Sequence, residues 1–153
     1  MKGFTLIELL IVISITAILA VGVSSFNLFG YRNKQDLDLT AREIVVILRN
    51  AQDRSISQES GGNYGVYFDN IDANGAFYDL FNGASYSSGT IIKKIPLKNN
   101  ISFVIPQNGA SSSVVFSPLS GIPVSSSTVA ISLKSDILSS STIIINSNGN
   151  ISF

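Results

Sequence analysis

Residues 4–23 read FTLIELLIVISITAILAVGV, and this stretch decides how the rest of the chain is organised. It is nearly all apolar and contains no proline. As a helix rising 1.5 Å per residue it would extend about 30 Å, the thickness of the hydrocarbon core of a bilayer. A secretory signal peptide has a shorter apolar run and a small-residue cleavage site, whereas this run continues past Ala20 to Val23. We therefore predict a transmembrane helix over residues 4–23, with a cleaved signal peptide as the alternative.

Two charges in this region carry further information. Lys2 is the only charge ahead of the apolar run, and it favours an N-terminus in the cytoplasm with the rest of the chain outside. Glu8 lies inside the run, where a carboxylate costs about 2.5–3.5 kcal/mol on insertion scales. One interpretation is a glutamate at the membrane interface, one turn inside the headgroups. The other is a glutamate that meets a cation within the membrane.

That cation would be available if the chain were cut after Gly3. The new terminus would be the α-amino group of Phe4, which is positively charged at neutral pH. Glu8 lies one helical turn from this amine in its own chain, near the positive end of the helix. Between staggered neighbours, Glu8 of one subunit could instead pair with the Phe4 amine of another. Such a pair would favour one axial register of the helices over others.

The N-terminal residues resemble the class III leader of type IV pilins and type II secretion pseudopilins. The resemblance rests on Met1-Lys2-Gly3 followed by Phe4-Thr5-Leu6-Ile7-Glu8-Leu9-Leu10. It implies that residues 1–3 are a leader, that a prepilin peptidase cleaves between Gly3 and Phe4, and that Phe4 is then N-methylated. It also implies that Glu8 helps incoming subunits dock. Many major pilins carry a proline further along this helix, whereas here Ser25 stands near that place.

Helical spacing continues over residues 24–60, now with one apolar stripe and charged opposite faces. The stripe comprises Leu37, Ala41, Ile44 or Val45, Leu48 and Ala51, at steps of three and four. Asp38–Arg42 and Arg49–Asp53 have the spacing of ion pairs along a helix. Ser60-Gly61-Gly62-Asn63 is expected to end the helix. We predict one helix from about Phe4 to about Gln58, its second half amphipathic and packed on a globular head.

Residues 61–153 form that head, in which short β-rich runs alternate with Gly, Pro, Asn and Ser. Asn148-Gly149 predicts a two-residue hairpin, and the serine triplets at 111–113, 125–127 and 139–141 are expected in loops. The fold class is therefore α+β, a long N-terminal helix with about seven or eight short antiparallel strands. The strands are expected over 64–68, 76–81, 91–95, 101–105, 114–116, 129–133, 143–146 and 151–153.

The head resembles the general secretion pathway H type (GspH) of minor pseudopilins, which include FimT-like minor pilins. The residues that carry this resemblance are Tyr64–Phe68, Val115–Pro118 with Gly121, and Ile143–Asn146 joined through Gly149 to the last strand. It implies two sheets packed on the C-terminal half of the helix. It also implies a low-copy subunit near the tip of a pilus or pseudopilus.

Composition argues against an enzyme. The chain has ten basic and ten acidic residues, only 13% charged residues, and no cysteine or histidine. Thiolate and imidazole metal sites and a Ser-His-Asp triad are thereby excluded. Asp69, Asp72 and Asp79 gather near one turn without an evident acid–base partner. We expect no catalytic residue, no metal site and no cofactor, and the lack of a GxxxxGK[ST] motif means that any ATPase must be a partner.

Two weaker patterns remain in the head. Asn70-Ile71-Asp72-Ala73-Asn74-Gly75 imitates the start of a calcium loop, but its twelfth position is Phe81 where a glutamate is needed. Lys93, Lys94 and Lys98 form a small basic patch, which would be a candidate DNA contact in an uptake pilin. The C-terminal tail carries no basic side chain, and the charge balance does not favour adhesion to nucleic acid. We expect neither a calcium site nor a nucleic-acid partner.

These observations predict a structural subunit, a minor pilin or pseudopilin of a type IV pilus or a type II secretion pseudopilus, polymerised through its apolar helix. Its partners would be other pilin subunits, prepilin peptidase, an assembly platform with its ATPase, and membrane lipid before assembly. It would be a single-pass protein of the inner (cytoplasmic) membrane and then part of the filament. The alternative is a tip-located binding module of an uptake or adhesive pilus, for DNA or a surface ligand.

Overall fold

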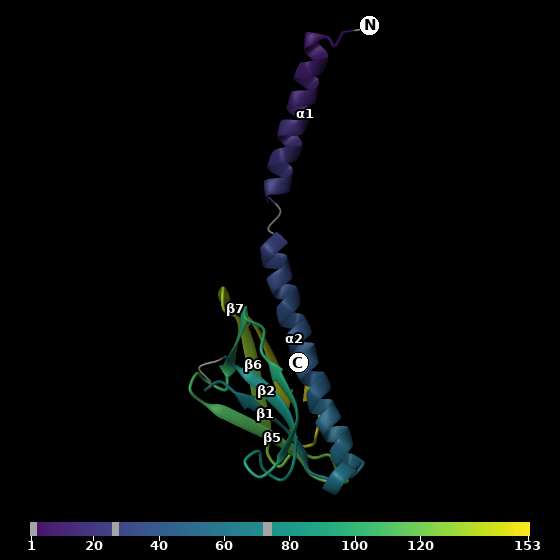
Figure 1. The fold of residues 1–153 in the computed structure, drawn as a ribbon, viewed down its shortest axis with the longest axis vertical. Helices are drawn as coiled ribbons and strands as arrows, with labels where there is room; N and C mark the ends of the chain where they lie inside the picture. Colours follow the sequence, from purple (N-terminus) through teal and green to yellow (C-terminus); the bar gives the residue numbers. More distant parts are fainter. Residues whose placement is uncertain (1–2, 26–27, 72–74) are drawn as a thin grey trace. The chain divides into compact units, whose positions relative to one another are not determined.

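The computed structural model describes residues 3–25, 28–71 and 75–153, without the side chains of residue 21 and of residues 23–30. The chain divides into two compact units, residues 1–32 and 33–153. The leader residues Met1 and Lys2 lie outside the described residues. Figure 1 shows the ribbon with both helices and several of the strands labelled.

The first unit contains helix α1, Leu6–Ser25. The second helix, α2, runs over Leu28–Ile56, and from Asn33 onward it belongs to the second unit. The predicted continuity from Phe4 to Gln58 crosses Phe26 and Asn27, which lie outside the described residues, so it stays a prediction. Within the part of the chain that the structure describes, no helix is both long and apolar enough to cross a membrane. The transmembrane role of residues 4–23 is not confirmed and also stays a prediction.

The predicted apolar stripe of α2 is confirmed. Ala41, Ile44, Leu48 and Ala51 are fully buried, and Leu37 and Val45 are nearly so. The predicted pair Asp38–Arg42 is also present, with 2.9 Å between Oδ2 and Nε. Arg49 instead donates to the backbone carbonyl of Ile151 at 3.5 Å. One face of α2 therefore packs on the head while the other carries charges.

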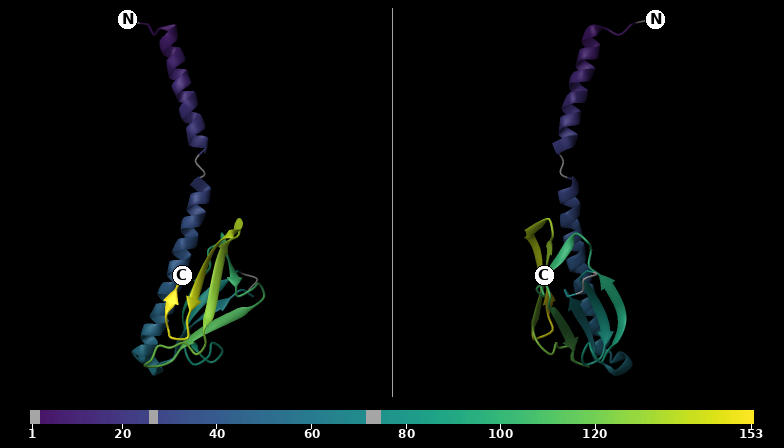
Figure 2. Two further views of the ribbon diagram at one scale, coloured as in Figure 1. Left: turned by 180° about the vertical axis from the view of Figure 1, so that it is seen from behind. Right: turned by 60° about the vertical axis from the view of Figure 1, so that its left-hand side comes forward.

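Within the described residues the head has two four-stranded antiparallel sheets, as the resemblance to the H-type pseudopilins implies. One has the order β3-β2-β1-β5 and the other the order β4-β6-β7-β8. The views in Figure 2 show the sheets side by side with α2 along them. Among the described residues the strands are β1 Tyr64–Asp69, β2 Phe77–Asn82, β3 Thr90–Pro96, β4 Ile101–Ile105, β5 Ser111–Phe116, β6 Ser127–Leu133, β7 Asp136–Ile145 and β8 Ile151–Ser152.

The sheets and α2 share one apolar core. The first sheet contributes Tyr64, Val66 and Phe68 from β1, with their neighbours on β2 and β5. The second contributes Ile131 and Ile143, and the stripe of α2 closes the cluster. The core residues alternate along β1, β4, β5, β6 and β7, which is the period of a strand with one face in the core, whereas β2 is buried on both faces from Phe77 to Phe81.

Two expectations about serines and turns are wrong. The triplets at 111–113 and 139–141 lie inside β5 and β7 rather than in loops, because Ser113 pairs with Tyr67 and Ser141 pairs with Ile131. The hairpin between β7 and β8 has three loop residues rather than two, since the N–H of Asn146 donates to the carbonyl of Asn150. Gly149 has the left-handed conformation, with φ at +86°, that such a three-residue loop requires.

Candidate functional site

The N-terminal site begins with helix-free backbone. Gly3 and Phe4 precede α1, and the side chain of Phe4 is 80% exposed. The side-chain oxygen of Thr5 accepts from the backbone N–H of Glu8 at 3.3 Å, and its carbonyl accepts from the same group at 3.1 Å. Thr5 thus caps the helix, and Glu8 falls in its first turn, where the helix dipole favours a carboxylate. The predicted cut lies just outside a capped helix, in accessible chain.

Helix α1 presents apolar side chains on every side. Large apolar residues from Leu6 to Leu19 are between 52% and 83% exposed. A helix that is hydrophobic all round is typical of a buried environment. Ser14 and Thr16 interrupt the pattern, but their hydroxyls donate to the carbonyls of Leu10 and Val12 at 2.8 and 2.9 Å. Their polar hydrogens are therefore satisfied within the helix, which suits an apolar surrounding.

Glu8 is the only charged side chain in the sequence of α1, and it is exposed. The surface of α1 therefore carries one carboxylate among bulky apolar residues. Cleavage between Gly3 and Phe4, methylation of Phe4 and docking through Glu8 stay predictions. What the structure adds is that all three residues lie together at one end of an exposed apolar helix.

The head carries a second candidate site, a groove of about 750 Å³. Its lining comes from residues 70, 75 and 76, from β2, β3 and β4, from the loops after β3 and β4, and from the residue after β6. We call it the lysine groove because Lys94, Lys98 and Lys134 line it. The other lining residues are Asn70, Gly75, Ala76, Phe77, Pro96, Leu97, Asn99, Ile101, Ser102, Phe103 and Asn108.

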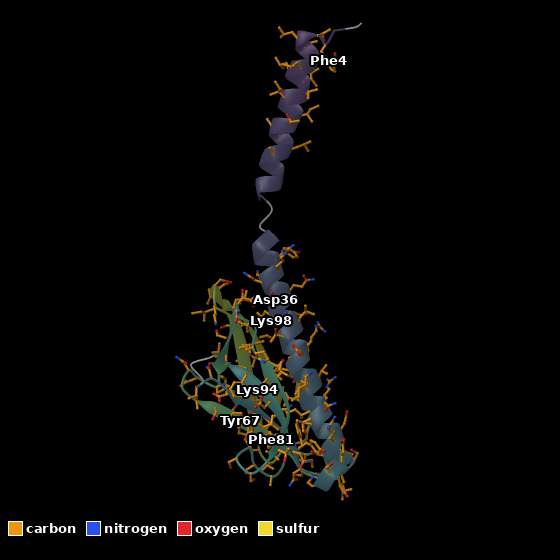
Figure 3. All side chains as sticks on the ribbon, viewed as in Figure 1. Phe4, Asp36, Tyr67, Phe81, Lys94 and Lys98 are labelled. Carbon is orange, nitrogen blue, oxygen red and sulfur yellow. The ribbon has the colours of Figure 1, made fainter. Side chains whose placement is uncertain are left out.

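Contacts hold the wall of the lysine groove in place. Lys98 Nζ lies 2.7 Å from Asp36 Oδ1 of α2, and Figure 3 shows the two side by side. The amide of Asn100 donates to the other oxygen of Asp36 at 3.0 Å, and its carbonyl accepts from the N–H of Lys134 at 3.0 Å. The Lys98 and Asn100 contacts hold the pKa of Asp36 below its ordinary value of 3.8. The lysines thus come from segments that are fixed to one another.

The predicted basic patch is only partly correct. Lys94 and Lys98 line the groove, with Lys94 Nζ 3.4 Å from the ring centre of Phe77, but Lys93 is not among the lining residues. Lys93 and Lys94 are neighbours on β3, so their side chains point to opposite faces of the sheet. Sequence reasoning missed Lys134, which the pairing of β4 with β6 brings to the groove. The available signal was that Lys134 is the only cation beyond Lys98.

Two of the three carboxylates considered for chemistry, Asp69 and Asp79, have structural partners. Asp69 accepts from the N–H of Ile71 at 2.6 Å, and Asp79 is buried and accepts from the hydroxyl of Tyr86 at 2.7 Å. Burial and the neighbouring Asp79 raise the pKa of Tyr86. Asp72 and the middle of the calcium-like stretch lie outside the described residues. Within the described ranges no group of three or more acidic side chains could hold a metal ion.

Comparisons with known proteins gave two kinds of match, one to the N-terminal residues and one to the fold. Residues 1–24 match the model of the prokaryotic N-terminal methylation motif. The fold is similar to the crystal structure of the type IV minor pilin FimU from Pseudomonas aeruginosa PAO1. The TM-score is 0.57 at 16% identity, covering 80% of this chain and 91% of FimU. A second crystal form of FimU gives a TM-score of 0.53 at 17% identity, covering 76% and 90%.

No curated protein matches the sequence significantly. The motif and the fold were found independently, one in the N-terminal residues and the other over most of the chain. Both agree with the resemblance that the first ten residues carry. The chain thus combines a prokaryotic N-terminal methylation motif over residues 1–24 with a fold similar to that of a type IV minor pilin.

Proposed function

We propose that the chain is a minor pilin or pseudopilin that is cleaved after Gly3, methylated on Phe4 and polymerised through α1. The observation that carries this proposal is the exposure of α1, an all-round apolar helix behind a methylation motif. Fully burying a Leu or Ile side chain contributes about 1.5–3 kcal/mol, so bringing α1 into apolar surroundings is strongly favourable. The family implies association with other pilin subunits and processing by prepilin peptidase.

The apolar surrounding would change during the life of the subunit. We propose that α1 is stored in the inner membrane, with the N-terminus in the cytoplasm and the head outside, and then moves into the core of a filament. Both environments are apolar, so the helix exchanges lipid neighbours for protein neighbours without exposure to water. An assembly platform and an ATPase would supply the work. The motif supports the anchoring, and the internal hydrogen bonds of Ser14 and Thr16 suit both environments.

Glu8 would set the register of the incoming subunit. Its carboxylate in the first turn of α1 would pair with the methylated amine of Phe4 on a neighbour, and this attraction would offset part of the cost of a charge in apolar surroundings. Replacing one partner would leave the other charge buried and alone. The docking step should therefore be far more sensitive to Glu8 than membrane storage is.

A variant comparison tests this docking role. Glu8→Leu is expected to accumulate in the membrane like the wild type and to be incorporated into filaments at least tenfold less. Thr16→Val serves as the matched control, because it changes a polar residue of the same helix without removing a charge, and it should be incorporated normally. Quantitative blotting of membrane and sheared-filament fractions measures both. Normal incorporation of Glu8→Leu would contradict the pairing role.

A second candidate function is that of a binding module at the tip of the filament. The observation that favours it is the lysine groove. Residues 61–153 contain four cations, and three of them line this one groove. Binding of a ligand there is compatible with polymerisation through α1, because the groove is lined by residues 70–134 only.

A further inference from the structure

The lysine groove concentrates positive charge on a head that otherwise has little charge. Lys94, Lys98 and Lys134 line it, and none of its described lining residues is acidic. Asp36 neutralises Lys98 from outside the lining, at 2.7 Å. Lys94 and Lys134 are exposed and neither forms an ion pair with a described residue, so both ammonium groups can meet an anionic ligand.

The other lining residues indicate which further chemical groups the ligand carries. Asn99 and Asn108 are exposed amides and Ser102 is a half-buried hydroxyl, so the walls offer several neutral donors and acceptors. The aromatic residues Phe77 and Phe103 are only 6% and 5% exposed. They give the groove an apolar floor, but they present no open ring face on which a nucleic-acid base could stack.

The size of the groove fits a small ligand or a short segment of a polymer. Its volume of about 750 Å³ lies within the usual range for small-molecule sites, roughly 300–1,000 Å³. A double helix is bound by a basic stripe that follows its phosphates, not by three ammonium groups around a concave site. The combination of cations, amides and a hydroxyl instead matches a compact ligand with both negative charge and many hydroxyl groups.

We propose that the lysine groove binds an acidic saccharide, a sugar chain that carries carboxylates. The ammonium groups of Lys94 and Lys134 meet the carboxylates, and Asn99, Asn108 and Ser102 hydrogen-bond the hydroxyls. The Asp36–Lys98 pair positions the wall of the groove. The inference goes beyond the structural role of the subunit and does not depend on polymerisation.

To test this, trigalacturonate is titrated into the full chain in detergent micelles, and the heat of binding is measured by calorimetry. Saturable binding is expected, at least tenfold tighter than that of the neutral galactose trimer, and weakened by added salt. Lys94→Gln and Lys134→Gln should each weaken binding about two- to fivefold, as expected for loss of one exposed charge contact. Lys93→Gln is the matched control, because it removes the adjacent lysine on β3 that does not line the groove, and its affinity should equal that of the wild type.

Three outcomes would overturn the proposal. They are equal affinity for the acidic and neutral trimers, equal weakening by Lys93→Gln and Lys134→Gln, and tighter binding of a single-stranded DNA oligonucleotide than of trigalacturonate. Circular dichroism melts of each variant show that the comparison is made between folded proteins. Lys134 is exposed, so Lys134→Gln is the variant least able to disturb the fold.

Discussion

At the scale of single residues, Gln52 shows how α2 is joined to the head. Its side-chain amide donates to the carbonyls of Gly121 and Gly149, both at 2.9 Å. These two carbonyls belong to the β5–β6 connection and to the β7–β8 hairpin. One side chain therefore fixes two loops that lie far apart in the sequence to the same turn of the helix.

Removing this side chain should loosen both loops. We expect Gln52→Ala to lower the free energy of unfolding by about 1–3 kcal/mol, since two carbonyls lose a donor in a half-buried site. Asn50→Ala, on the exposed face of the same helix, is the control and should change it by less than about 0.5 kcal/mol. Chemical denaturation of the two variants in the same detergent measures the difference. Equal midpoints for Gln52→Ala and the wild type would show that the loops do not depend on this side chain.

The lowered pKa of Asp36 predicts that the stability of the folded chain depends on pH. Lys98 and Asn100 hold its pKa below 3.8 in the folded chain, so in this range the unfolded state binds more protons than the folded state. The contribution of Asp36 to stability is therefore complete above pH 3.8 and is lost as the pH falls through the lower, folded-state pKa. Asp36→Asn should melt below the wild type at pH 7 and together with it at the lowest pH at which both fold. A difference in melting temperature that grows on acidification would contradict this sign.

At the scale of elements, β1 is the strand on which the first sheet depends, because it pairs with both β2 and β5. Gly65 lies in this strand and leaves room for the ring of Phe81. A Cβ atom at this position would lie 2.7 Å from the ring atom Cζ of Phe81 and 2.7 Å from the carbonyl oxygen of Val114. The carbonyl belongs to the backbone of β5, so the clash cannot be relieved by a side-chain rotation.

Gly65→Ala is therefore expected to destabilise the head, by about 1–3 kcal/mol as is usual for overpacking. Gly22→Ala is the control, because beyond the adjoining helix backbone the added carbon has no neighbour within 4 Å, and it should not lower the melting temperature of the head. Thermal denaturation followed by circular dichroism in the strand region measures both. An unchanged transition for Gly65→Ala would mean that β1 and β5 can separate without loss of stability.

The helices and strands also show which parts of the structure could be predicted from the sequence. The stripe of α2 was predictable because its period is set by the helix itself, and Ala41, Leu48 and Ala51 are buried as expected. The serine-rich first part of β7, residues 136–142, was not predicted as strand, whereas its last residues were, because a strand is fixed by its partner more than by its own composition. Ser140 pairs with Ser132 of β6, a contact that no local pattern in the sequence reveals.

At the scale of the whole molecule, the two candidate sites also differ in how far they could be predicted from the sequence. The N-terminal residues Gly3, Phe4 and Glu8 could be singled out from the sequence because they are neighbours in it, and their roles stay predictions. The lysine groove was only half predicted, because Lys134 reaches Lys94 and Lys98 through the pairing of β4 with β6 and the hydrogen bond to Asn100. A motif of neighbouring residues can be recognised in the sequence, whereas a site that is assembled by strand pairing cannot.

The two units also differ in how many charged residues they contain. Residues 4–23 hold a single charge, that of Glu8, while residues 33–153 hold the ion pairs of α2 and the lysine groove. Such a division is expected of a subunit whose one end enters apolar surroundings while the other stays in water. The central claim is that the apolar end becomes functional only when a new amine is made at Phe4.

The most direct measurement is the intact mass of the protein purified from its native membrane, combined with N-terminal sequencing. We expect a chain that lacks Met1, Lys2 and Gly3 and carries one additional methyl group on the amine of Phe4. A chain that keeps these three residues and still enters filaments would contradict the account.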